Sequence, residues 1–152
     1  MTGKILFILG TASVFSWLLT VEGIPEQLTT AISSLHAGRL LMLLIINVVL
    51  LIVGTFIDTI SALVIFTPLL LPLAASVGVD PIHFGVIVAV NLTIGMITPP
   101  VGVCLFVTSG IARVSIREVM PDLAPMIVVL VVVLATITYW ADLAMWLPGY
   151  LG

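Results

Sequence analysis

Charged residues are scarce in this 152-residue sequence. Four Lys and Arg and seven Asp and Glu make up only 7% of the chain, whereas 62% of its residues are hydrophobic. A soluble domain carries about 25% charged residues, because its surface must face water. So few charges cannot cover a water-facing surface, and we infer an integral membrane protein that is solvated largely by lipid.

Several kinds of functional site are also missing. The single cysteine, Cys104, can form neither an intrachain disulfide nor, alone, a cysteine metal cage. His36 and His83 lie far apart without a metal-ligand spacing, and no Ser-His-Asp pattern is recognisable. A phosphate-binding loop and a basic stripe are absent too, which excludes ATP hydrolysis and nucleic-acid partners. The sequence therefore predicts a protein that is not an enzyme.

The few charges leave five charge-free stretches, at residues 5–21, 40–57, 59–79, 81–112 and 123–141. A helix needs about 20 apolar residues to cross the hydrocarbon core of a bilayer. We therefore predict spans at residues 1–21 and 122–147, the first belonging to the mature protein because no cleavage-like motif follows it. Residues 22–38 are more polar, with apolar residues at helical spacing, which predicts a short interfacial helix.

A long apolar region is interrupted near its centre by Gly54–Asp58. The arms on either side, about 40–53 and 59–76, are each slightly short for a full crossing. Asp58 is costly at a lipid-facing depth, and non-helical backbone is tolerated there only when it is buried in protein or lines a cavity. We predict a re-entrant hairpin over residues 39–76 with a buried tip. Two ordinary spans joined by a tight aqueous turn are the alternative.

A second interruption lies within residues 81–112, which are too long for one span and too short for two. Pro99 and Pro100 remove two helix donors and bias Thr98 away from helical angles. We predict a helix broken here at membrane depth, an arrangement with which transporters hold ions and substrates. A proline kink without a ligand is the alternative.

Positive charges predict the orientation of the chain. Lys4, Arg113 and Arg117 fall on one side of the membrane in this arrangement, and Arg39 falls on the other. The positive-inside rule then places residues 113–121 in the cytoplasm as a connector and the C-terminus outside. This topology is the same whether the hairpin re-enters or crosses twice.

Oxygen donors at membrane depth are the distinctive chemistry of the sequence. With at most one carboxylate they suit a hard cation of low charge, whereas a transition metal prefers His or Cys. Sodium, held by carbonyls and hydroxyls at broken helices, is the natural candidate. The candidate residues for sodium or substrate binding are Asn47, Gly54, Thr55, Asp58, Asn91, Thr98, Pro99, Pro100 and Gly102, with Gly54, Thr55 and Thr98 as metal ligands.

Other roles are open for three of these polar side chains. Asn47 and Asn91 also suit hydrogen bonds between membrane helices. Asp58 precedes the second hairpin arm, and we favour a capping role over direct ligation because a carboxylate would bind sodium too tightly for release. We expect His83, beside Asp80, to lie at the membrane interface without a functional role.

Taken in order, these segments resemble the C-terminal part of the large membrane subunit of tripartite ATP-independent periplasmic (TRAP) transporters. The resemblance covers essentially all 152 residues and rests on Gly54–Thr55–Phe56–Ile57–Asp58, Pro68, Pro72, Gly78–Val79–Asp80–Pro81–Ile82–His83–Phe84–Gly85, Asn91 and above all Gly95–Met96–Ile97–Thr98–Pro99–Pro100–Val101–Gly102. It implies an all-α, elevator-type carrier with two inverted repeats, each holding a re-entrant hairpin and a broken helix. The chain resembles the second repeat alone, with its hairpin tip facing the break and its outer spans as scaffold.

The resemblance also implies a function. It implies sodium-coupled import of a small organic anion across the bacterial inner membrane, with sodium as the coupling ion and no other cofactor. The implied partners are the remaining half of the large permease subunit, a small membrane subunit and a periplasmic substrate-binding protein. No second copy of the hairpin pattern occurs, so we expect a fragment or one half of a split permease. A non-transporting membrane scaffold or assembly subunit is the alternative.

Overall fold

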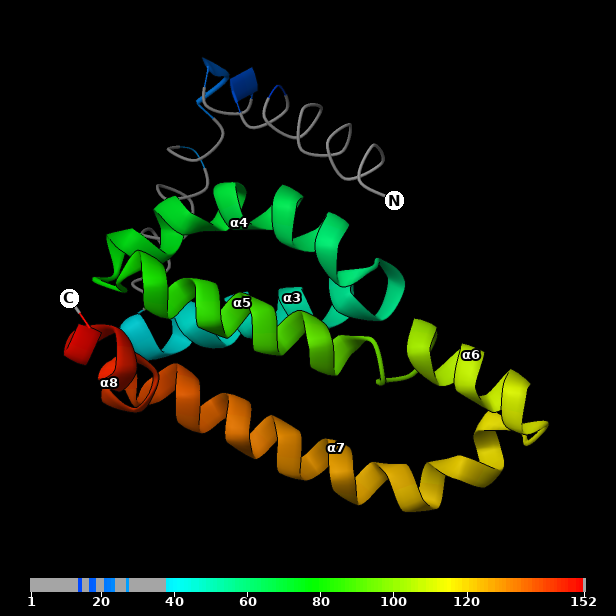
Figure 1. Ribbon diagram of the computed structural model, residues 1–152. Coiled ribbons are helices and arrows are strands. Elements are labelled where there is room, and N and C mark those ends of the chain that lie inside the picture. Colours follow the sequence, from blue (N-terminus) through cyan, green and yellow to red (C-terminus); the bar gives the residue numbers. More distant parts are fainter. Residues whose placement is uncertain (1–13, 15–16, 19–20, 24–26, 28–37, 152) are drawn as a thin grey trace.

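The structure is a computed structural model that describes residues 14, 17–18, 21–23, 27 and 38–151 (Figure 1). From residue 38 on, the elements are α3 (Arg39–Phe56), α4 (Thr59–Ser76), α5 (Pro81–Gly95), α6 (Val103–Ala112), α7 (Ile116–Tyr139) and α8 (Ala141–Leu151). Helices α3, α4 and α7 are long and apolar enough to cross a membrane, which confirms the all-helical membrane class. The predicted span at 1–21 and the predicted interfacial helix at 22–38 lie largely outside the described residues.

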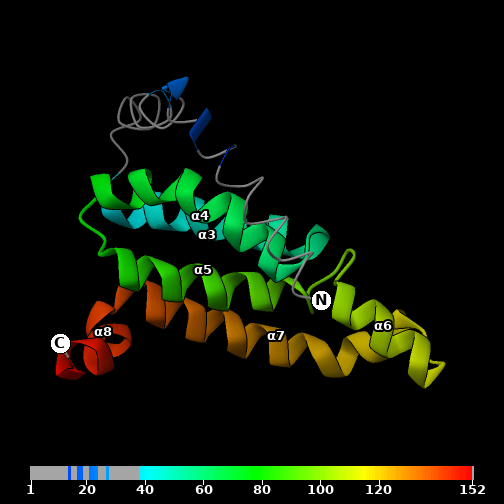
Figure 2. The same ribbon diagram turned by 45° about the horizontal axis from the view of Figure 1, so that its top comes forward.

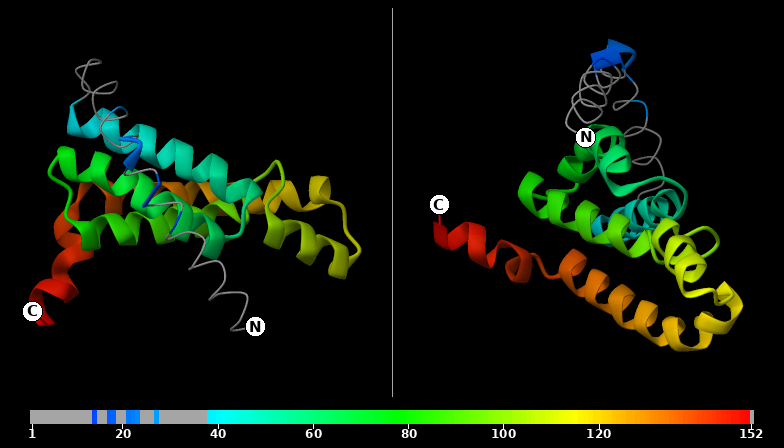
Figure 3. Two further views of the ribbon diagram at one scale, coloured as in Figure 1. Left: turned by 90° about the horizontal axis from the view of Figure 1, so that it is seen from above. Right: turned by 45° about the vertical axis from the view of Figure 1, so that its right-hand side comes forward.

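Helix α5 is central to the arrangement. Helices α3 and α4 pack against it, and α7 runs along it from another side (Figures 1 and 2). Helices α3 and α5 run in parallel, because Asn47 contacts Asn91 and Gly54 contacts Gly95 farther along both helices. The hairpin tip and the end of α5 therefore lie at one end of the bundle, beyond which α6 extends (Figure 3).

The apolar core lies where α3, α4 and α5 meet. Leu50 of α3, Ala62 of α4 and Phe84 of α5 are completely buried there. Most of α7, in contrast, is exposed along an apolar face that includes Val128 and Val132. An exposed apolar surface of this size is typical of contact with lipid or with another protein segment.

Side-chain hydrogen bonds join the end of α7 to the beginnings of α3 and α5. Asn47 Nδ2 donates to Thr138 Oγ1 (3.2 Å), Tyr139 OH donates to Leu40 O (3.2 Å), and His83 Nε2 pairs with Ile137 O (2.8 Å). His83 is consequently buried within the protein, and its expected depth at the membrane interface stays a prediction. The burial has a tertiary cause, because α7 folds back over the beginning of α5 and covers the imidazole.

Helix α7 has different bounds from those that charge alone predicts. It begins at Ile116, inside the cytoplasmic segment predicted at residues 113–121, because Ser115 and Glu118 form a capping box. Glu118 N donates to Ser115 Oγ, and Ser115 N donates to Glu118 Oε2 (3.1 Å). The Ser-x-x-Glu pattern of a capping box can be recognised in the sequence. The helix ends at Tyr139, and α8 then leaves in another direction (Figure 3).

We expect Thr138→Val to weaken the attachment of α7 to α3, because it removes the hydroxyl that accepts from the buried Asn47 amide. The free energy of unfolding should fall by about 0.6–1.7 kcal/mol, the range for hydrogen bonds between membrane helices. Thr136→Val is the matched control, since the exposed Thr136 hydroxyl donates within its own helix to Val132 O (2.9 Å). Thermal unfolding in nanodiscs measures both, and equal melting temperatures would contradict the role of Thr138.

Candidate binding site at the hairpin tip and the helix break

The backbones of α3 and α5 touch at Gly54 and Gly95. A Cβ atom at Gly95 would lie 2.6 Å from the carbonyl carbon and 2.7 Å from the Cα of Gly54. A Cβ atom at Gly54 would lie 3.1 Å from Leu92 O. Small residues permit such close approach between membrane helices. The contact holds the hairpin tip against the end of α5.

The hairpin tip is Gly54–Asp58, in which Ile57 and Asp58 join the end of α3 to the beginning of α4. Asp58 Oδ1 accepts a hydrogen bond from Ser61 N (3.1 Å) and so caps α4, the role that the sequence favours. Gly54 and Thr55 are buried, whereas Phe56 and Asp58 are exposed. The tip is therefore buried on its inner side alone, because α5 and the segment after it cover that side.

The break is the connector Met96–Gly102, between the end of α5 and the beginning of α6. Gly102 has a positive φ of 52°, and a Cβ atom there would lie 3.1 Å from Thr98 O, so the position requires glycine. Gly102 N donates to Thr55 O (3.2 Å), and Cys104 N donates to Met96 O (3.1 Å). The connector is thus bonded both to the hairpin tip and to the first turn of α6.

A cavity of about 200 Å³ lies between the tip and the connector. It is lined by Leu51, Ile52, Thr55, Phe56, Thr98, Pro99, Pro100, Ile127 and Val131. Thr55 Oγ1 donates to Ile52 O (2.7 Å), and Thr98 Oγ1 donates to Ile94 O (2.7 Å). Because each hydroxyl proton is directed to its own helix, the lone pairs of both oxygens remain available to a cation or a hydrogen-bond donor.

Four helix ends meet where the hairpin tip contacts the connector, a region that we call the junction. Helices α3 and α5 end here, and their partial negative charges favour a cation. Helices α4 and α6 begin here with partial positive charges. Asp58 caps α4, but Gly102 provides no side-chain cap for α6. The positive end of α6 is therefore the one suited to an anionic group.

Asn47 and Asn91 lie outside the junction, in a buried cluster of their own. Asn91 Nδ2 donates to Asn47 Oδ1 (2.6 Å) and to Asn47 O (3.1 Å). Asn47 precedes Gly54 by seven residues, which is about 10 Å along a helix. The two amides make the interhelical hydrogen bonds that the sequence left as their alternative role. Their part in sodium or substrate binding stays a prediction.

The structure thus groups most of the sequence-predicted residues and adds others. Gly54, Thr55, Asp58, Thr98, Pro99, Pro100 and Gly102 all belong to the junction. Sequence reasoning missed Ile127 and Val131 of α7, which have no local signal because their place depends on how α7 folds back. No group of three or more His, Cys, Asp or Glu that could hold a metal ion occurs in the described part of the chain. The oxygen atoms at the junction are hydroxyls, backbone carbonyls and the Asp58 carboxylate.

Comparison with known proteins gives a consistent set of relatives. Residues 1–143 match the sequence model of a family described as "Tripartite ATP-independent periplasmic transporter, DctM component". The uncharacterized protein YgiK of Salmonella typhimurium is 45% identical over 144 residues, which are 95% of this chain and 33% of that protein. The isethionate TRAP transporter permease protein DctMQ of Oleidesulfovibrio alaskensis is 42% identical, over 97% of this chain and 23% of that protein.

A further relative has a named substrate as well. The C4-dicarboxylate TRAP transporter large permease protein DctM of Vibrio cholerae is 40% identical over 151 residues, which are 99% of this chain and 33% of that protein. The chain therefore spans about a quarter to a third of the length of these relatives.

We expect Gly95→Ala to separate the hairpin tip from the connector, because its Cβ would meet the backbone of Gly54 at 2.6 Å. Overpacking of this kind costs about 1–3 kcal/mol of stability. Gly110→Ala is the control, since a Cβ there has nothing within 4 Å in the described chain. Melting temperatures measured side by side check the difference, and a Gly95→Ala protein as stable as the control would contradict the close contact.

Asp58→Asn distinguishes capping from ligation. Asn caps a helix about as well as Asp does, so we expect Asp58→Asn to keep the melting temperature of the parent protein. Asp58→Ala should lose about 1 kcal/mol of stability with the cap. A rise in melting temperature with sodium that the parent protein shows and an equally stable Asp58→Asn protein lacks would indicate instead that the carboxylate binds the ion.

Proposed function

Because the chain belongs to the DctM component family of tripartite ATP-independent periplasmic transporters, we propose that it forms part of the large permease of a sodium-coupled importer of a small organic anion. Family members are transporters and not enzymes. One observation carries the proposal: a cavity lies between the hairpin tip and the connector, beside the place where α3 and α5 end and α4 and α6 begin. These helix ends offer partial charges of both signs, suited to a cation and to an anion.

Sodium binds, in this proposal, between Thr55 and Thr98 with help from carbonyls near Gly54. Both threonines line the cavity, and each hydroxyl donates to a backbone carbonyl, so its oxygen keeps acceptor capacity. Two helix C-termini add partial negative charge without a full negative charge. A weakly held monovalent cation suits such a site, because the ion has to leave again after transport.

The transported substrate is an organic anion. Three relatives are named for isethionate, a C4-dicarboxylate and sialic acid, all of which ionise at neutral pH. No Lys or Arg lines the cavity within the part of the chain that the structure describes. The positive end of α6 and the sodium ion itself are then the charges that offset the anion. Binding of one ion favours the other, which is the physical basis of coupling.

The whole transporter requires further components. We propose that the chain acts with the rest of the large permease, a small membrane subunit and a periplasmic substrate-binding protein in the bacterial inner membrane. Reconstitution of these components in proteoliposomes, with labelled isethionate, C4-dicarboxylate and sialic acid, tests the function. We expect uptake of one anion under an inward sodium gradient and none when choline replaces sodium. Assembly without uptake of any anion would favour a membrane scaffold.

Within this assay, Thr98→Val and Gly54→Leu test the position of the sodium site. Thr98→Val removes one oxygen ligand and should raise the sodium concentration for half-maximal uptake about tenfold, equivalent to about 1.4 kcal/mol. Thr108→Val is the matched control, because the exposed Thr108 hydroxyl makes the same bond to the carbonyl four residues earlier (2.8 Å). If neither Thr98→Val nor Gly54→Leu changes sodium activation in folded protein, the site lies elsewhere.

A further inference from the structure

A hydrogen bond to sulfur joins the second arm of the hairpin to the connector. Thr59 Oγ1 donates to Met96 Sδ (2.7 Å), and both side chains are half-buried. Thr59 is the first residue of α4, and Met96 is the first residue of the connector that follows α5. Neither residue lines the cavity of about 200 Å³ between the tip and the connector. The bond therefore lies beside the proposed sodium site and not within it.

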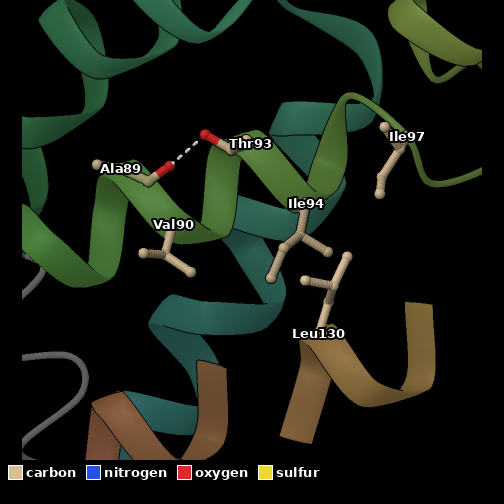
Figure 4. A pocket seen from close by; sticks show the side chains of 6 residues that line it. All are labelled: Ala89, Val90, Thr93, Ile94, Ile97 and Leu130. Atoms are coloured by element: carbon tan, nitrogen blue, oxygen red, sulfur yellow. Dashed lines mark hydrogen bonds between the residues drawn. The ribbon is translucent and has the colours of Figure 1, made fainter. Parts of the chain in front are cut away.

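The position of Thr59 explains why its hydroxyl bonds outside its own helix. A threonine hydroxyl within a helix usually donates to the carbonyl three or four residues earlier. Thr93 Oγ1 does so, donating to Ala89 O (2.7 Å) on α5 (Figure 4). Thr59 has no earlier carbonyl in its own helix, because α4 begins with it. Its hydroxyl donates instead to the thioether of the connector.

Met96 is bonded to three helices. Its sulfur accepts from Thr59 of α4, its amide donates to Leu92 O of α5 (3.2 Å), and its carbonyl accepts from Cys104 N of α6 (3.1 Å). Thr98, the connector threonine at the proposed sodium site, follows two residues later. A displacement of Met96 would therefore displace Thr98 as well.

The sulfur of Met96 adds something that packing alone does not require. Leucine has nearly the volume of methionine and usually replaces it in a core at little cost. A thioether differs because it accepts a hydrogen bond, although weakly. A weak bond between the hairpin and the connector suits a site whose ion has to enter and leave again.

We propose that Thr59 and Met96 form a latch, a side-chain bond between α4 and the connector that positions Thr98 for sodium. This inference rests on the proposed function, because it gives the two residues a role at the proposed sodium site. Both are positioning residues, since they act through Thr98 and do not line the cavity.

Sodium activation of uptake by the assembled permease tests the latch. Thr59→Val and Met96→Leu each remove the bond and should raise the sodium concentration for half-maximal uptake about fivefold, equivalent to about 1 kcal/mol, without changing the maximal rate. Thr59→Ser keeps the hydroxyl and should retain the parental value. Thr93→Val is the matched control, because the exposed Thr93 hydroxyl bonds only within α5.

The double variant distinguishes a shared bond from two separate effects. Thr59→Val combined with Met96→Leu should be no worse than either change alone, because one bond can be lost only once. Additive effects of the two changes, or parental sodium activation in folded Thr59→Val protein, would overturn the inference.

Hydrogen exchange of the Gly102 and Cys104 amides in the assembled permease is a measurement that does not require transport. Thr59→Val and Met96→Leu should each speed the exchange of both amides about fivefold, because the connector opens more often without the latch. Thr93→Val should leave the exchange unchanged. Parental exchange in the two latch variants would overturn the inference too. A permease that imports nothing but shows the faster exchange would count against the proposed function alone.

Discussion

The contact between Gly54 and Gly95 determines what the remainder of the junction can be. With their backbones touching, α3 and α5 end side by side. The connector that follows α5 therefore lies within hydrogen-bond distance of the end of α3, where Gly102 N donates to Thr55 O. A side chain at position 95 would move one helix by more than a hydrogen bond tolerates, because 2.6 Å is well inside van der Waals contact. The cavity between Thr55 and Thr98 exists because this contact fixes the separation of its walls.

Interrupted helices inside a bilayer require each exposed backbone group to find a partner in the protein. Here the two interruptions satisfy one another in part, since Gly102 N donates to Thr55 O. Within the hairpin, Asp58 accepts from Ser61 N and caps its own helix. The threonine hydroxyls donate to carbonyls of their own helices and keep acceptor capacity in reserve. The two threonine oxygens can therefore still accept, which suits a cation, whereas the first amides of α6 have no side-chain cap.

The sequence predicts this junction well because its signals are local. Pro99 and Pro100 break a helix wherever it packs, and Asp58 caps the residues that follow it. The positions of His83, Ile127 and Val131 could not be predicted, because each depends on α7 folding back across α5. The beginning of α7 is a different case, since the Ser115–Glu118 capping box marks it in the sequence, whereas the spacing of charges places it several residues later. Re-entry into the membrane depends on surroundings that the chain alone does not contain.

The two polar clusters of the bundle differ in a way that suits transport. At one level Asn47, Asn91 and Thr138 bond to one another, so their amides hold α3, α5 and α7 at fixed spacing. About 12 Å farther along α3, Thr55 and Thr98 bond to backbone carbonyls of α3 and α5 and leave a cavity between them. Interhelical bonds at the second level would close the cavity. Because the two clusters lie at separate levels, the same helices are held together at the asparagines and can still bind a ligand in the cavity at their ends.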